Sequence, residues 1–163
     1  MTPEEIISKF RARNYVPMPN IPGNRIFVTD CTASTLVWAE ANVIIEHYML
    51  FPNAVVPLHS HPFVNRLIYM SGDYTGYYLD PVTGSNFEKT FTARDRHRIG
   101  REEPIGQLHG SKTGARGAHV YNIQIWPSTV TDPLSATLAY LGPSIGPLHD
   151  QERDRQCQRE DTN

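Results

Sequence analysis

The stretch PLHSHPFVNRLIYMSG, residues 57–72, holds two histidines, His59 and His61, ahead of a run of strand-forming residues that ends at a glycine. Alternate residues of a β-strand lie on one face, so the two imidazoles are expected to point the same way. Imidazoles placed in this way can bind one metal ion, and imidazole suits zinc, copper, iron and nickel. By itself the H-x-H pattern is more often a pair of surface or hydrogen-bonded histidines than a metal site, so a further ligand is needed to decide.

A third histidine ends a second stretch, PIGQLH, residues 104–109. Its proline and glycine predict a turn that delivers His109. Because a run of strands separates this turn from His59 and His61, the arrangement suits a ligand brought across a small barrel. The two stretches together favour a metal site made of His59, His61 and His109.

Short runs rich in Val, Ile, Tyr, Trp and Thr fill most of the chain and predict an all-β fold. The expected strands cover residues 25–30, 35–39, 42–51, 64–70, 74–79, 87–93, 96–99 and 119–126. Turns are expected at 71–73 and 80–84, a glycine-rich loop at 110–118, and at most one more strand, at 136–141. Many short strands with closely spaced turns indicate a sandwich or a barrel.

A short helix is expected before the strands, within residues 1–14. Thr2 suits the N-cap, Pro3 the first helical position, and Glu5 completes a capping box. At 163 residues the chain is expected to form one domain, over residues 15–148. The nearly all-polar residues 149–163 are expected to form a disordered tail.

The two histidine stretches resemble the paired motifs of the cupin superfamily, G-x5-H-x-H-x3/4-E-x6-G and G-x5-P-x-G-x2-H-x3-N. The matching residues are His59, His61 and Gly72 for the first motif and Pro104, Gly106 and His109 for the second. Asn65 stands in the glutamate position, and both leading glycines and the final asparagine of the second motif are replaced. The resemblance implies a cupin-type β-barrel (a double-stranded β-helix, or jelly roll) with a short N-terminal helix.

With asparagine at position 65, the site is similar to the cupins that bind metal through three histidines alone. Among these the chain resembles the β-diketone-cleaving dioxygenases of the acetylacetone dioxygenase type, through NYVPMP at 14–19 and QLHGSKTG at 107–114. This resemblance implies an Fe(II) dioxygenase that cleaves a small enolisable or diketone-like substrate. Three neutral ligands leave the metal its full charge, which an anionic substrate could neutralise.

Two other functions stay open. The same centre with zinc, manganese or nickel could serve a lyase, isomerase or hydrolase, which would need a general base near the metal. Alternatively, the loss of the glutamate at position 65 could mark a non-catalytic cupin that binds only a small ligand.

Tyr69 and His119 are the candidate catalytic residues. Tyr69 shares the strand face of His59 and His61, so it could be a phenol of the pocket or a core residue with a paired hydroxyl. His119 opens the last predicted strand and could be a base, a fourth ligand, or a core or rim histidine.

Asn65, Gln107 and Tyr121 are the candidate substrate-binding residues. The structural alternatives are a satisfied strand asparagine for Asn65 and a turn-exposed glutamine for Gln107. Tyr121 and Gln124 have opposite parity on one strand, so at most one of them faces inward.

Composition and charge favour a small-molecule partner. The net charge of −2 shows no bias toward nucleic acid. No apolar run approaches the ~20 residues of a membrane helix, and MTPEEIISKF lacks the apolar region of a signal peptide. We therefore expect a cytoplasmic protein with reduced Cys31 and Cys157, and the resemblance to cupins implies a homodimer.

Overall fold

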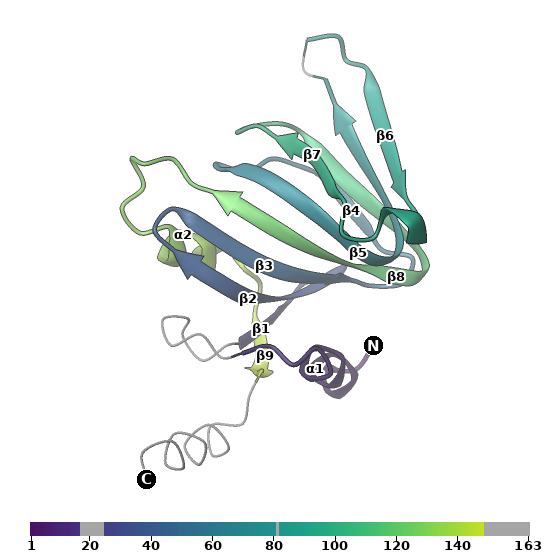
Figure 1. Cartoon of the computed structure of the whole chain (residues 1–163), viewed down its shortest axis with the longest axis vertical. Coiled ribbons are helices and arrows are strands. Elements are labelled where there is room, and N and C mark those ends of the chain that lie inside the picture. The colour runs from purple at the N-terminus through teal and green to yellow at the C-terminus, as the bar shows by residue number, and fades with distance from the viewer. Residues whose placement is uncertain (17–24, 81, 149–163) are drawn as a thin grey trace.

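The computed structural model describes residues 1–16, 25–80 and 82–148, and it folds them into a curved antiparallel sheet with a helix near each end (Figure 1). The elements are α1 (Pro3–Arg11), β1 (Arg25–Val28), β2 (Thr32–Glu40), β3 (Val43–Leu50), β4 (Val55–His59), β5 (Val64–Leu79), β6 (Asn86–Phe91), the 3-10 turn η2 (Ala93–Asp95), β7 (Ile99–Glu103), β8 (His109–Ile125), α2 (Pro133–Tyr140) and β9 (Ser144–Pro147). The predicted tail at 149–163 lies outside the described residues.

The strand order is β6-β5-β8-β3-β2-β1-β9, with β4 added on β8 and β7 added on β5. Every strand pairing among the described residues is antiparallel. Strand β8 is central, because β5 follows its whole length on one side while β4 and β3 share the other. The prediction of an all-β fold with a short N-terminal helix is confirmed.

Two segments predicted to be a turn and a loop are instead parts of long strands. Residues 71–73 continue β5, and residues 110–118 lie within β8. Both strands bend at bulges, where the β5–β8 register shifts between Tyr69 and Ser71 and again between Gly72 and Tyr74. Gly72 has φ of 101°, and a Cβ built on it would lie 2.2 Å from the carbonyl oxygen of Gly117. The glycines therefore mark close backbone contact at a bulge, not the end of a strand.

Other segments also differ from the sequence prediction. The possible strand at 136–141 is instead the end of helix α2, with Leu141 as its C-cap; Asp132 caps the start of this helix by accepting from the N–H of Ser135, and Pro133 begins it. The predicted strand at 96–99 is wrong, because β7 begins only at Ile99. Strands β4 and β9 were not expected. The sequence Asp132-Pro133 is a helix-start signal that could have identified α2.

Helix α1 agrees with its prediction and covers the outer face of the sheet. Thr2 and Glu5 form the capping box, and Ile6 and Phe10 are buried in an apolar cluster with Met49 and others. None of the described helices has the length and apolar character needed to cross a membrane. The cytoplasmic location stays a prediction.

A pair of stacked histidines lies beneath α1. The rings of His47 and His119 are 5.1 Å apart and nearly parallel, and their Nε2 and Nδ1 atoms are 3.3 Å apart. The Tyr15 hydroxyl is hydrogen-bonded to the Nδ1 of His47, and Phe10 packs edge-on against the same ring. Burial lowers the pKa of His47 to about 3 and that of His119 to about 4.

We expect Gly72→Ala to lower the free energy of unfolding by about 3 kcal/mol, because it adds backbone strain to a clash with the Gly117 carbonyl. Gly84→Ala is the matched control, since Gly84 also has positive φ, 66°, but has open space around its Cβ; it should cost about 1 kcal/mol. Urea unfolding measures both. Equal losses would contradict the role of Gly72 at the bulge.

Stability should fall as the pH drops from 6.5 toward 4. The folded pKa values of His47 and His119 lie below the ordinary value, so the unfolded chain takes up protons first and is favoured in this range. Urea unfolding at pH 7 and pH 5 should differ by about 1–2 kcal/mol for each histidine. His119→Gln should reduce this difference, whereas His97→Asn, at an exposed turn, should not. A difference unaltered by His119→Gln would contradict this origin.

Candidate metal centre

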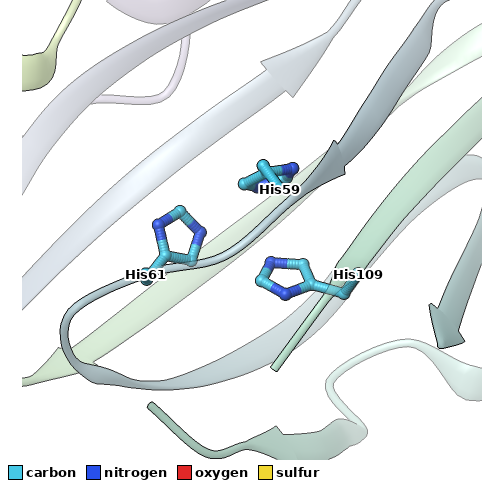
Figure 2. A group of neighbouring side chains, drawn as sticks. All are labelled: His59, His61 and His109. Atoms are coloured by element: carbon cyan, nitrogen blue, oxygen red, sulfur yellow. The ribbon is translucent and has the colours of Figure 1, made fainter. Parts of the chain in front are cut away.

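Three histidines from two separate parts of the chain meet at one place, as predicted. His59 ends β4, His61 follows it in the connection to β5, and His109 begins β8. Antiparallel pairing of β4 with β8 places His59 directly opposite His109. One potential ligand nitrogen from each of the three residues lies within 4.8 Å of the others, and Figure 2 shows the three rings gathered around one space.

Backbone carbonyls select the tautomers of two of these rings. The Nδ1 of His59 is 2.8 Å from the carbonyl oxygen of Pro57, and the Nδ1 of His109 is 2.8 Å from that of Gln107. A carbonyl oxygen only accepts, so Nδ1 is assigned the proton in each ring, and Nε2 keeps its lone pair. Such an outer hydrogen bond is typical of histidines that bind metal, because it fixes the ring and makes Nε2 a better ligand.

Burial keeps all three rings neutral. It lowers the pKa of His61 to about 3, and it lowers the pKa values of His59 and His109 as well. Neutral imidazole is the form that binds metal. Protons therefore compete only weakly with a metal ion for these nitrogens at neutral pH. These donors fit a divalent transition metal such as iron, manganese, nickel or zinc.

A buried carboxylate, Glu103, stands beside the histidines and was not found by sequence reasoning. Glu103 ends β7 and pairs with Asn65 of β5, and only 3% of its surface is exposed. Its Oε2 accepts a hydrogen bond of 2.7 Å from Asn65 Nδ2 and lies 3.2 Å from His109 Nε2. The carboxylate that position 65 lacks is therefore supplied by the neighbouring strand and held by Asn65 itself.

The contact between Glu103 and His109 favours a positive charge at this point. With its proton on Nδ1, His109 turns a lone pair toward the carboxylate oxygen 3.2 Å away. Two such acceptors repel unless a proton or a cation lies close to both.

The three histidines, Asn65 and Glu103 line one cavity of about 90 Å³. Apolar side chains of the barrel interior, among them Leu50, Leu67 and Val120, form its floor. The Oδ1 of Asn65 is buried and has no hydrogen-bond partner among the described residues. An acceptor left free in this way is available to a donor on a bound molecule.

The other predicted site residues do not line this cavity. Tyr69 is a core residue that stacks on Phe91, and its hydroxyl donates to the carbonyl of Gly72 at 2.8 Å. His119 and Tyr121 lie around His47 beneath α1. These positions give no support to roles in catalysis or substrate binding.

Gln107 contributes to the site through its backbone. Its side-chain amide donates to the carbonyls of Leu79, at 2.6 Å, and Leu108, at 3.0 Å, which anchors the turn before β8. Its own carbonyl accepts from His109 Nδ1. Gln107 therefore positions a candidate ligand, while Asn65 is the predicted substrate-binding residue that does line the cavity.

Among solved structures, the chain is similar to oxalate decarboxylase from Bacillus subtilis. A tryptophan-to-tyrosine variant of that enzyme is 14% identical with a TM-score of 0.56, over 69% of this chain and 29% of that one. A structure from a study of its Mn(II) centres is 16% identical with the same TM-score, over 66% and 29% of the two chains. The likeness shows a cupin fold. The chain spans less than a third of each of these two structures. No family model and no curated protein matches it.

We expect Ni(II) or Zn(II) to bind metal-free protein at one site per chain and to raise its melting temperature, because a ligand that binds only the folded state stabilises it. His109→Ala should abolish both effects by removing a converging ligand. His97→Asn, which removes an exposed histidine, should leave them intact. Calorimetric titration gives the stoichiometry, and unchanged affinity in His109→Ala would contradict the assignment.

Proposed function

We propose that this chain is a divalent-metal-dependent oxidoreductase, a dioxygenase that uses Fe(II) to cleave a small enolisable, diketone-like substrate. The observation that carries the proposal is the meeting of three neutral imidazoles with one buried carboxylate in one cavity. A cleavage in which both atoms of O2 enter the products, as one carbon–carbon bond of the diketone breaks, balances without an outside reductant.

His59, His61 and His109 would hold the metal, which, when bound, supplies Lewis acidity to a chelated oxygen and redox chemistry toward O2. The protein fixes these ligands before metal binds, since Pro57 and Gln107 orient two of the rings through their carbonyls. Preorganised ligands of this kind favour one coordination geometry.

Glu103 is proposed to act as the general base. An enolisable substrate must lose a proton from the carbon between its carbonyl groups, and the buried carboxylate of Glu103 can accept it. Asn65 holds Glu103 Oε2 from one side at 2.7 Å, which keeps the carboxylate beside the metal ligands. The free Oδ1 of Asn65 can accept a hydrogen bond from a donor on the bound substrate.

A manganese-dependent lyase is the second candidate. The fold is shared with oxalate decarboxylase, a structure of which comes from a study of its Mn(II) centres. A lyase also needs a proton donor near the metal, and Glu103 could serve in its protonated form. Oxygen consumption separates the two candidates, because a decarboxylation without net oxidation consumes none.

Glu103→Gln should lower kcat of substrate-dependent O2 uptake at least 100-fold, because an amide cannot accept the substrate proton. The assay uses an oxygen electrode, Fe(II)-loaded protein and a set of enolisable diketones that starts with 2,4-pentanedione. Glu102→Gln is the matched control. Glu102 precedes Glu103 in β7 but points to the other face of the strand, where it is exposed and forms an ion pair with Arg66 of β5.

Metal content is measured in the same samples. Full metal content in Glu103→Gln supports a role as base, whereas loss of metal would make Glu103 a ligand. Fe(II)-loaded wild-type protein that consumes no O2 with any of these substrates would contradict the dioxygenase proposal.

A further inference from the structure

A second cavity, of about 300 Å³, adjoins the metal cavity and shares part of its wall. Both are lined by His59, His61 and Tyr48, together with Thr32 and Val56. We call the second space the arm cavity. A molecule bound at the three histidines from this side must pass through it or extend into it.

The walls of the arm cavity suit an uncharged group. None of the described residues that line it is Asp, Glu, Lys or Arg. Phe27, Leu141 and the rings of Tyr48 and Tyr140 give it an apolar surface. A charged group would lose its hydration here without gaining a partner, whereas an apolar group loses only its contact with water.

Tyr140 is an aromatic wall that is held in place and still open. Its ring lies 6.4 Å from that of His61 and 6.1 Å from that of Phe63, yet 43% of its surface is exposed. Its hydroxyl accepts from Gln124 Nε2 at 2.8 Å, so the ring cannot turn away freely. A partly exposed aromatic ring that is held beside a candidate metal ligand is what a second ring or alkyl group could cover.

Helix α2, which carries Tyr140, is itself anchored to the barrel. The Thr137 hydroxyl donates to Gln124 Oε1 at 2.8 Å, and the Trp126 indole N–H donates to the same oxygen at 2.9 Å. The cavity wall is therefore held by hydrogen bonds within the chain, and a wall held in this way lowers the entropic cost of binding.

We propose that the arm cavity binds the uncharged, apolar arm of the same small molecule whose chelating head is bound at His59, His61 and His109. This inference rests on the proposed metal chelation and deepens it, since it assigns the substrate class: a chelating enol or enolate that carries an aryl or branched alkyl substituent. The metal cavity, of about 90 Å³, is the smaller of the two and holds the three histidines, and the arm cavity, of about 300 Å³, is the adjoining space for a substituent.

Two hydroxamates that chelate metal equally well through the same head test the inference without turnover. Acetohydroxamate has only a methyl group, and benzohydroxamate has a phenyl arm. Calorimetric titration of Ni(II)-loaded protein should give at least tenfold tighter binding for benzohydroxamate. Cys31→Trp, which fills the arm cavity from its lining, should remove that advantage and leave acetohydroxamate binding unchanged. Val82→Trp adds the same ring at a remote exposed position and should change neither.

Labelling of the folded protein gives a second readout if Cys31→Trp does not fold. In a Cys157→Ser background, N-phenylmaleimide should modify the partly exposed Cys31. Benzohydroxamate should slow this reaction severalfold, and acetohydroxamate should not.

Three results would overturn the inference. Equal affinity for the two hydroxamates would contradict binding of a substituent in the arm cavity. The dioxygenase proposal would still be tested separately by the O2-uptake assay. If neither hydroxamate binds, chelation at a metal held by the three histidines is contradicted as well. A Cys31 that does not react in the ligand-free protein would mean that the chain itself covers the cavity.

Discussion

The antiparallel register of β8 with its neighbours is the constraint on which the site depends. Its first half pairs with β4, which sets His59 opposite His109, while β5 runs along its full length. Strand β5 in turn pairs with β7, which sets Asn65 opposite Glu103. Four strands, β4, β8, β5 and β7, thus deliver their side chains to one point through their backbone pairing. A shift of one residue in either pairing would turn these side chains to the opposite face.

The bulges make such a register compatible with a closed pocket. On β5, Asn65 and Leu67 line the cavity, and so does Tyr74, so the inward parity changes between residues 67 and 74. On β8, His109 and Ser111 line it, and so do Val120 and Asn122, so the parity changes there as well. An extra residue at a bulge bends the strand. It also shifts the alternation of side chains, so that residues after the bulge with the opposite parity point inward. Close contact between Gly72 and Gly117 lets the two backbones meet at this bend.

This parity change explains which parts of the site the sequence could reveal. His59, His61 and His109 were identified because each lies in a short motif whose spacing is local. The side-chain direction of His119 could not be predicted, since His119 lies ten positions after His109 and a bulge between them turns it outward. Glu103 was missed because Glu102 precedes it, and only pairing with β5 decides which of the two faces the histidines. Strands were identified more reliably than their connections, for the same reason: glycines at 72 and 117 look like turns until their partners are known.

Buried polar groups of the barrel hold helix α2 in place, and through Tyr140 this helix contributes to the surroundings of the candidate metal centre. Gln124 uses both amide hydrogens, toward Glu46 and Tyr140, and its oxygen accepts from Trp126 and Thr137. Burial raises the pKa of Glu46 to about 7, although the Gln124 N–H favours its charged form. A polar network this deep is costly unless its members are paired. All four hydrogen-bonding positions of the Gln124 side chain are filled, and two of these bonds go to Tyr140 and Thr137 of α2. These bonds favour one position of α2 on the barrel and one position of the Tyr140 ring beside His61. The position of Tyr140 in the cavity wall therefore depends on Gln124, Trp126 and Thr137, which do not themselves line either cavity.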